Sequence, residues 1–458
     1  MACKNDELSQ GILLEKTSVK STLAGIMSYE QANELVSLPE EEYNPPSLPF
    51  SLPKFDAKVE LGSDDMRDHF YIDFKNWIFM NHGGFGGTLK AAVETVHQTQ
   101  IHVEKQPLRF IDRELLPHMV FAIRKLAGFV SCDPRDLVLV SNATEGLNTV
   151  IRSLRLGKGD KVYYLNLRYY AVNKLFAHLK QENGIEIKEI PLNFPFTKEE
   201  LLNTITKTLD ADTKLAVFDH IPSVHPIILP VKEIIEICHQ KGVQVLIDGA
   251  HALGAVPLNL TTLNADYYVI NCHKWLCNAK GCGALYVDKK HQSSIKCLTV
   301  SGGFGRGFTP EFIFRGLKDY SPFLALHTVL EFWNTMGVDR IQDHNRNLAH
   351  KAAKMLSGDW QTDTLFSLGM YGPMVLVRLP DILWRSQMTD TQNIVSKANA
   401  ELVQDRLHYN YGIEVPIKPI NGGLYARISA HVYNKIEDYD ALRNAVRALA
   451  EQCSLPNL

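Results

Sequence analysis

The sequence predicts an α/β protein in which a large domain with a mainly parallel sheet is followed by a smaller α+β domain. The chain has 458 residues, 45% of them hydrophobic, which is enough for a large core. This length exceeds that of a typical single domain. From Asp136 onward, short apolar runs recur between helix-like segments, an alternation typical of parallel strands covered by helices on both faces. After about residue 335 the segments become longer and amphipathic, which indicates a second domain.

The strands of the large domain are expected where Val, Ile and Tyr concentrate. These runs span residues 137–140, 161–167, 215–218, 243–247, 267–270 and 284–287. One intervening helix follows Pro230, a residue suited to a first turn, and places its apolar side chains on one face. These side chains are Val231, Ile234, Ile235 and Cys238. Runs at 374–378, 414–416 and 424–428 are expected to form strands of the small domain.

The first 65 residues are polar and expected to form an arm. Four prolines that disfavour regular elements interrupt this segment: Pro45, Pro46, Pro49 and Pro53. The large domain then covers residues 66–335, and the small domain consists of residues 336–458 together with the arm.

Composition argues against several classes of partner. The formal net charge is -3 and no long run of Lys and Arg occurs, so a nucleic-acid partner is not expected. No stretch is long and apolar enough to span a bilayer, and the first residues lack the apolar core of a secretory signal. The eight cysteines contain no CxxC pair, which favours reduced thiols and a cytoplasmic location. Cys272, Cys277 and Cys282 match no common zinc spacing, so no metal site is expected.

A first chemical signal lies at residues 141–146, where an apolar strand ends and an amphipathic helix begins near Glu145. Backbone N–H groups at a helix N-terminus have no partner within the helix, so they can bind a phosphate. Ala143 and Thr144 would lie in this position, and Thr144 would add a hydroxyl donor. The alternative is an ordinary helix cap, because Ser, Asn and Thr favour such positions in any protein.

A second signal is the strand at 245–247 that ends in Asp248, with His251 three residues later. A pyridoxal-phosphate (PLP) enzyme needs a carboxylate at such a strand end to keep the pyridine nitrogen protonated. His251 could reach the phenolic oxygen of that ring. A helix cap for Asp248 and a turn cap for His251 are the structural alternatives.

A third signal is the strand at 269–271, which leads into His273 and Lys274. Burial disfavours the charged form of lysine, lowers its pKa and so promotes Schiff-base chemistry. A lysine with a purely structural role at a strand end would normally be exposed.

Three further motifs accompany these segments: Met80-Asn81-His82-Gly83-Gly84-Phe85-Gly86, Asp219-His220-Ile221-Pro222-Ser223 and Asp319-Tyr320-Ser321-Pro322. Together the motifs, over roughly residues 70–450, resemble class V aminotransferase-fold enzymes, and within them the isopenicillin N epimerase-like and cysteine desulfhydrase-like group. The resemblance implies a PLP-dependent transferase fold of the aspartate aminotransferase type, with pyridoxal 5'-phosphate as cofactor. It also implies a homodimer with sites formed between subunits.

The resemblance implies roles for individual residues. Lys274 would hold the cofactor as an internal aldimine and move the substrate proton, Asp248 would bind the pyridine nitrogen and His251 the phenolic oxygen. Tyr169 matches the aromatic residue that stacks on the ring, with Tyr170 as the alternative. The implied phosphate ligands are Ala143, Thr144, Asn271 and His273.

Substrate contacts follow from the same resemblance. Arg427 matches a small-domain arginine that binds the substrate carboxylate, for which a guanidinium fork is geometrically suited. Asn81 and His220 would line the pocket. The alternative for Arg427 is an exposed position on the outer face of a sheet.

The chain departs from the family pattern at two positions. Leu317 stands where the family commonly has a Thr that reaches the partner subunit's phosphate, and Leu cannot donate that hydrogen bond. Arg306 and Arg315 are candidates to compensate for the phosphate contact that Leu317 cannot make. Gly302 stands where many relatives have His.

The activity expected first is β-elimination from a cysteine-type amino acid, with cleavage of a C–S bond. Epimerisation is the second expectation and transamination the third. A desulfurase would need a mobile nucleophilic cysteine, for which Cys297 is the only candidate. Leu317 motivates a further alternative, a catalytically silent scaffold protein, which Lys274 and Asp248 argue against.

Overall fold

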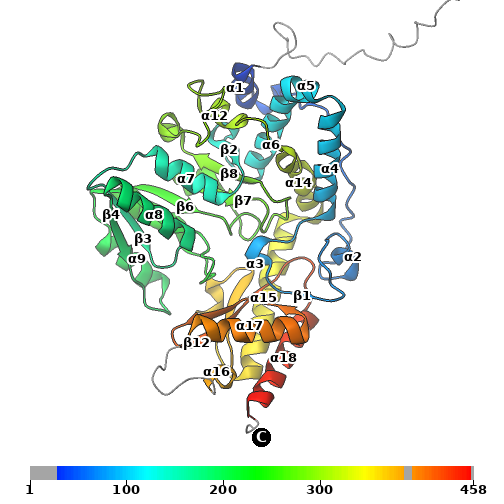
Figure 1. Cartoon of the computed structure of the whole chain (residues 1–458), viewed down its shortest axis with the longest axis vertical. Coiled ribbons are helices and arrows are strands. Elements are labelled where there is room, and N and C mark those ends of the chain that lie inside the picture. Colours follow the sequence, from blue (N-terminus) through cyan, green and yellow to red (C-terminus); the bar gives the residue numbers. More distant parts are fainter. Residues whose placement is uncertain (1–27, 386–394, 455–458) are drawn as a thin grey trace, which may run out of the picture.

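The computed structural model describes residues 28–385 and 395–454, and a seven-stranded sheet forms its centre (Figure 1). The strand order is β2-β8-β7-β6-β5-β3-β4. The strands are β2 (Leu137–Val140), β3 (Lys161–Leu165), β4 (Glu186–Ile190), β5 (Thr213–Asp219), β6 (Gln244–Asp248), β7 (Tyr267–Asn271) and β8 (Gly283–Val287). Strand β8 is antiparallel to both neighbours and the other pairs are parallel, so the prediction of a mainly parallel sheet is confirmed.

Helices cover both faces of this sheet because its strands are apolar on both sides. Val217 and Phe218 are neighbours in β5, yet they enter different cores, since successive strand side chains point to opposite faces. The core that contains Val217 includes α7 (Ala143–Ser153) and α8 (Tyr170–Asn183). The other core includes α6 (Leu115–Phe129), α9 (Lys198–Thr208), α10 (Val231–Gln240) and α14 (Leu326–Met336). Helix α10 buries the four apolar residues predicted for its inner face.

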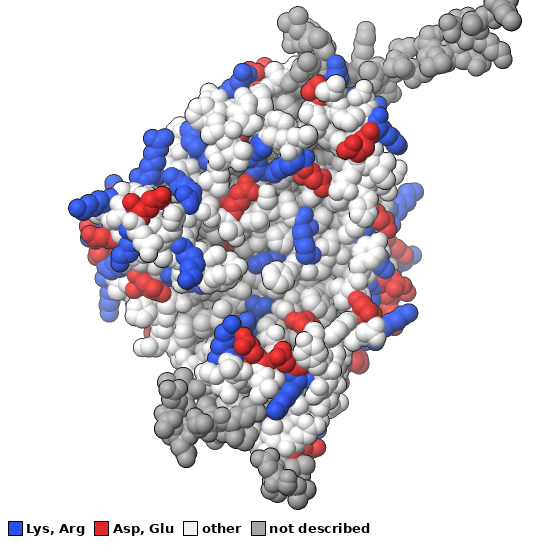
Figure 2. Space-filling model, in the orientation of Figure 1, with Lys and Arg blue, Asp and Glu red and all other residues white. Residues whose placement is uncertain are grey.

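Shorter helices and one long helix complete the large domain. They are α2 (Asp64–Arg67), α3 (His82–Phe85), α4 (Lys90–Lys105), α5 (Pro107–Arg109), α11 (Leu260–Leu263), α12 (Phe308–Ile313) and α13 (Ser321–Leu324). None of the helices in the described ranges is long and apolar enough to cross a membrane. Figure 2 shows Lys and Arg interspersed with Asp and Glu on the face in view.

The small domain lies below the large one in Figure 1 and contains an antiparallel sheet of order β11-β12-β9. Its elements are β9 (Met374–Arg378), β11 (Ile417–Ile420), β12 (Gly423–Ser429), α15 (Val338–Trp360), α16 (Ile382–Arg385), α17 (Lys397–Tyr411) and α18 (Ile436–Ser454). The strand expected at 414–416 is wrong in its bounds: β10 (Ile413–Glu414) pairs with β1 (Ile78–Phe79), and β11 begins after Pro416. Pro416 has no N–H for the ladder, although its carbonyl oxygen still accepts from the N–H of Arg427 in β12 at 2.9 Å.

The arm is more ordered than its prolines indicate, and it does not belong to the small domain alone. Helix α1 (Tyr29–Ser37) starts at a capping box formed by Ser28 and Gln31. It packs on α6 and α12 of the large domain. Further along, Arg340 of α15 donates hydrogen bonds to the carbonyl oxygens of Ala57 and Val59. The arm therefore contacts both domains.

Candidate active site

The ends of three neighbouring strands bring polar side chains to one edge of the large sheet. Asp219 ends β5, Asp248 ends β6 and Asn271 ends β7, and Asp219 is directly opposite Asp248 in the strand register. The carboxyl ends of parallel strands are where open α/β sheets bind ligands. The small domain reaches the same edge, because Arg427 of β12 donates to the carbonyl oxygen of Ser223, just after β5.

Lys274 lies in the loop after β7, where its amine is desolvated. Burial lowers the pKa of Lys274 to about 8, although the carboxylate of Asp248 opposes the shift. Its Nζ lies 2.9 Å from Nε2 of His251. A larger share of neutral amine is therefore present near neutral pH than in an exposed lysine.

The protonation state of His251 follows from its second contact. Trp275 Nε1 donates to Nδ1 of His251 over 3.3 Å, and an indole nitrogen can only donate. Burial also lowers the pKa of His251 well below its usual value, so the ring is neutral and carries its hydrogen on Nε2. That hydrogen points at Lys274, which can accept it in its neutral form, whereas the charged amine that predominates below a pKa of about 8 can only donate. Trp275 is thus a site residue that sequence reasoning missed.

Asp248 and Asp219 form a buried pair of carboxyl groups. Oδ1 of Asp248 accepts a hydrogen bond from the N–H of Ala250 over 3.0 Å, and burial raises the pKa of Asp248. Burial, with the neighbouring charge of Asp248, raises the pKa of Asp219 well above its usual range. Oδ1 of Asp219 has no hydrogen-bond partner within the described structure. Sequence reasoning treated Asp219 only as part of a motif, although it also ends an apolar strand next to the one that ends in Asp248.

Helix α7 starts at Ala143 rather than near Glu145, because Asn142 is its cap and accepts from the N–H of Glu145 over 2.9 Å. Asn271 Oδ1 accepts from the N–H of Ala143 over 2.8 Å, which ties the end of β7 to the start of this helix. Thr144 is exposed at the same end. The structure therefore brings Ala143, Thr144 and Asn271 together at a helix N-terminus, and because the N–H of Ala143 is bonded to Asn271, their role as phosphate ligands stays a prediction.

His273 lies in the same loop, partly exposed. Burial lowers its pKa to about 4, so it is neutral near pH 7. Its Nδ1 lies 3.3 Å from the carbonyl oxygen of Cys282, which can only accept, so the hydrogen of the neutral ring is on Nδ1. In this tautomer Nε2 has no hydrogen to give to a phosphate, and the predicted role of His273 requires a different proton placement.

Of the two arginines considered as compensation for Leu317, the structure places Arg315 at the start of α7. Its buried guanidinium bonds to Glu145 in the first turn, and its Nε and Nη2 atoms have no partner among the described residues. Arg306 is elsewhere, paired with Glu30 of α1 at 2.7 Å. The side chain of Leu317 is 79% exposed.

Tyr169 rather than Tyr170 borders the carboxyl pair. The backbone of Tyr169 lowers the pKa of Asp219 in part, and the pKa of the Tyr169 hydroxyl is raised by burial, by Tyr170 and by the charge of Asp248. Tyr170 packs against it edge-on, with ring centroids 4.7 Å apart, and is more exposed. His220 joins this group through its backbone, whose N–H donates to the carbonyl oxygen of Asp248 at 2.8 Å, while its side-chain Nδ1 lies 2.6 Å from the hydroxyl of Tyr268.

Arg427 is 3% exposed, so the alternative of an exposed position on the outer face of the sheet is wrong. Its Nη1 lies 2.5 Å from the carbonyl oxygen of Ser223, and its Nη2 donates to Oδ1 of Asn81 over 2.9 Å. Asn81 in turn donates to Glu414 over 3.0 Å. Burial lowers the pKa of Arg427 to about 10, and no carboxylate pairs with it in the part of the chain that the structure describes. A buried guanidinium without a counter-ion is suited to bind an anionic ligand.

His82, Cys277 and His431 lie close enough to one another to hold a metal ion. Both nitrogen atoms of His82 are already in hydrogen bonds, to Tyr433 Oη and to the carbonyl oxygen of Lys274. Nε2 of His431 likewise faces the carbonyl oxygen of Trp275. The cluster is therefore a hydrogen-bonded one, and the expectation of no metal site stays a prediction.

Sequence comparison with known proteins indicates the family to which this chain belongs. Residues 118–375 match the family model described as aminotransferase class-V. An L-cysteine desulfhydrase of Arabidopsis thaliana is 30% identical over 414 residues, which cover 83% of this chain and 89% of that protein. The isopenicillin N epimerase of Streptomyces clavuligerus is 26% identical over 390 residues, which cover 81% and 94% of the two chains.

Solved structures show the same fold. A cysteine desulfurase from Thermococcus onnurineus superposes with a TM-score of 0.70 at 18% identity, covering 86% of this chain and 99% of its own. The cystine C–S lyase C-DES, in complex with its reaction product cysteine persulfide, gives 0.68 at 18% identity, covering 82% and 98%. The predicted aminotransferase-like fold is confirmed. With its family model matched over residues 118–375, the chain belongs to the class-V aminotransferase family and is a pyridoxal-phosphate enzyme.

Proposed function

We propose that this protein is a C–S lyase that performs β-elimination on a cysteine-type amino acid, giving pyruvate, ammonia and a thiol or sulfide. The observation that carries the proposal is Arg427, a buried guanidinium without a carboxylate partner among the described residues, at the strand edge that holds Lys274 and Asp248. Such a group binds the carboxylate of an amino acid in a fixed orientation. The similarity to a plant L-cysteine desulfhydrase supports the cysteine-type substrate.

The residues present fit PLP. Asp248 offers a buried carboxylate to a protonated pyridine nitrogen, and the exposed Thr144 and the side-chain amide of Asn271 lie at the start of α7, where they would hold a phosphate. The unpartnered nitrogens of Arg315 lie beside this helix start. When bound, PLP supplies an electron sink for the charge left at the substrate α-carbon.

Individual side chains would bind the substrate, move its α-proton and orient the amine that takes this proton. Arg427 would hold the substrate carboxylate, with Asn81 keeping the guanidinium in place. The neutral amine of Lys274 would take the α-proton, and its lowered pKa keeps it available as a base near neutral pH. His251, whose N–H points at that amine, would orient it between transfers.

Cys297 supports elimination over persulfide transfer. This side chain is 8% exposed, and burial raises the pKa of its thiol. A desulfurase nucleophile needs an accessible thiolate. Cys297 is therefore poorly suited to accept sulfur.

Epimerisation is the second candidate, because the similar isopenicillin N epimerase matches over 94% of its length. An epimerase shares the removal of the α-proton and returns a proton to the opposite face. The two reactions differ in whether a bond at the β-carbon breaks.

A panel of L-amino acids with the PLP-loaded protein separates these candidates. Each reaction would be scored for pyruvate, for sulfide or thiol, for α-hydrogen exchange in deuterated water and for the D-isomer. We expect pyruvate and sulfide from L-cysteine or a related S-substituted substrate, and none from Lys274→Ala, which lacks the base. Formation of a D-isomer without pyruvate would instead identify an epimerase. Failure to form a PLP absorption band that borohydride removes would leave only the scaffold alternative.

We also propose that the protein is a homodimer in the cytoplasm. Four large apolar side chains between residues 298 and 317 are exposed, as at a protein interface: Leu298, Val300, Phe304 and Leu317. The seven described cysteines are free, in keeping with a reducing compartment.

A further inference from the structure

Four consecutive carbonyl groups of the loop that carries Lys274 each accept a hydrogen bond from outside the loop. In order, Lys274 O accepts from His82 Nε2 at 3.0 Å, Trp275 O from His431 Nε2 at 3.0 Å, Leu276 O from Trp333 Nε1 at 3.0 Å, and Cys277 O from Leu89 N at 3.1 Å. Three of the donors are side chains, and they come from α3, from the segment after β12 and from α14. The loop is thus held by elements far apart in the sequence.

We propose that His82, His431 and Trp333 are positioning residues for the amine of Lys274, and that they act on the reaction by holding the carbonyl groups of residues 274–276. The inference rests on Lys274 as the reacting amine of the proposed function. We call these three side chains the loop clamp.

The direction of each bond in the loop clamp is fixed. Burial lowers the pKa of His82 well below its usual value and that of His431 to about 3, so both rings are neutral and carry one hydrogen each. A carbonyl oxygen only accepts, so that hydrogen is on Nε2 in both rings. Tyr433 completes the arrangement, because its hydroxyl lies 2.7 Å from Nδ1 of His82.

The loop clamp also reaches Lys274 by a second route. The rings of His82 and His431 are stacked with centroids 4.0 Å apart, and the indole of Trp275 packs on His82 at 4.9 Å. Trp275 donates to His251, and His251 contacts the amine of Lys274. A shift of the loop would therefore move both the lysine and the histidine that orients it.

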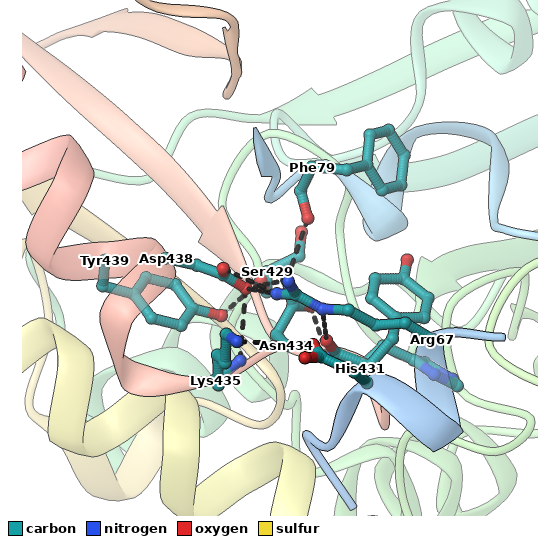
Figure 3. A network of polar contacts seen from close by, with 10 residues as sticks. Arg67, Phe79, Ser429, His431, Asn434, Lys435, Asp438 and Tyr439 are labelled. Atoms are coloured by element: carbon teal, nitrogen blue, oxygen red, sulfur yellow. Dashed lines mark hydrogen bonds and ion pairs between the residues drawn. The ribbon is translucent and has the colours of Figure 1, made fainter. Parts of the chain in front are cut away.

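Figure 3 shows how the segment after β12 is itself held in place. Asn434 Oδ1 accepts from the N–H of His431 at 3.0 Å, and Asn434 Nδ2 donates to the carbonyl oxygen of Phe79 at 2.9 Å. Asp438 bonds both Asn434 and Arg67. The strand that leads into this segment carries Arg427. The segment after β12, held by these bonds, therefore fixes the position of the loop that carries Lys274 relative to Arg427.

The test compares variants that remove one donor but keep a ring. Trp333→Phe removes the side-chain donor to Leu276 O, and His82→Phe removes the side-chain donor to Lys274 O, which keeps its bond from the N–H of Cys277. His82→Gln restores an N–H at similar reach. Trp360→Phe and His327→Phe are matched controls. Each of these buried rings has a nitrogen without a hydrogen-bond partner among the described residues, and neither ring is hydrogen-bonded to the loop that carries Lys274. Each protein is loaded with PLP, and the pH midpoint of its cofactor absorption band is measured beside kcat, KM and thermal unfolding.

We expect Trp333→Phe and His82→Phe to shift the absorption midpoint and to lower kcat roughly ten- to a hundredfold at little changed KM, as misplacement of a reacting group does. His82→Gln should recover most of this loss, and the controls should behave as the natural protein. If His82→Phe does not fold, Trp333→Phe alone decides. An unchanged midpoint and kcat, or a loss that only follows the unfolded fraction, would overturn the proposal. A natural protein that forms no PLP band would instead contradict the proposed function.

Discussion

The pKa of Lys274 determines when its amine can react with an aldehyde. At a pKa of about 8, roughly one amine in ten is neutral at pH 7, whereas an unperturbed lysine has about one in several thousand. We expect the rate of PLP uptake by the cofactor-free protein to rise about tenfold per pH unit below pH 8 and to level off above it. Stopped-flow absorption between pH 6 and 10 measures this. A rate that still rises steeply at pH 10 would mean that the amine is not desolvated.

Arg427 offers a second test at the scale of one residue. Arg427→Lys keeps the charge but cannot make two parallel hydrogen bonds to a carboxylate. We expect kcat/KM for the amino acid to fall by about one to two orders of magnitude, or roughly 1.5–3 kcal/mol, while PLP occupancy is retained. Arg378→Lys in the neighbouring strand β9, a site paired with Asp381, should leave both unchanged. Loss of PLP in Arg427→Lys would assign the arginine to the cofactor instead.

The sequence indicated some of the site residues that follow apolar strands, because a polar side chain at a strand end stands out in the sequence, although Asp219 at the end of β5 was treated only as part of a motif. Lys274 and Asp248 were predicted in this way, whereas Asn271 was implied only by the family resemblance. The loop clamp was not, because His82, Trp333 and His431 come from three segments that meet only in the folded chain. Their hydrogen bonds are made to backbone carbonyl groups, which every residue has, so the residue types in the loop do not reveal these contacts.

At the scale of elements, helix α7 combines a structural cap with a phosphate site. Asn142→Ala removes the cap and should cost about 1 kcal/mol of stability without large loss of PLP affinity. Asn271→Ala removes the bond to Ala143 and an amide that faces the helix start, so it should weaken PLP binding as well. Thermal unfolding of the cofactor-free proteins and PLP titration by fluorescence separate the two effects. Equal PLP affinity in both variants would contradict the site at this helix.

The bounds of a strand or helix were easier to predict where all its side chains are buried than where buried and exposed side chains are mixed. The run at 137–140 matches β2, which is buried throughout. Strand β4 was missed because it lies at the edge of the sheet and contains three charged residues among its five, so it lacks a continuous apolar run. Helix α1 was missed because the prolines that follow it dominated the interpretation, although its capping box was present in the sequence.

At the scale of the whole molecule, the exposed apolar side chains between residues 298 and 317 lead to the last prediction. Leu317 is 79% exposed and Val300 70%, and Arg315, two residues before Leu317 in the sequence, contacts the start of α7. An interface over this region would lie beside the phosphate site. Leu317→Asp and Val300→Asp would place an unpaired charge in it, which is costly when buried.

We expect each of these variants to weaken dimerisation at least about tenfold and to lower PLP affinity in the monomer that results. Sedimentation velocity across a concentration series, followed by PLP titration of each species, measures both. Tyr409→Asp is the matched control, because Tyr409 is 78% exposed on α17 in the small domain, away from this region. A natural protein that sediments as a monomer at all concentrations would contradict the dimer. A variant that dissociates yet binds PLP normally would keep the dimer and remove the interface from the cofactor site.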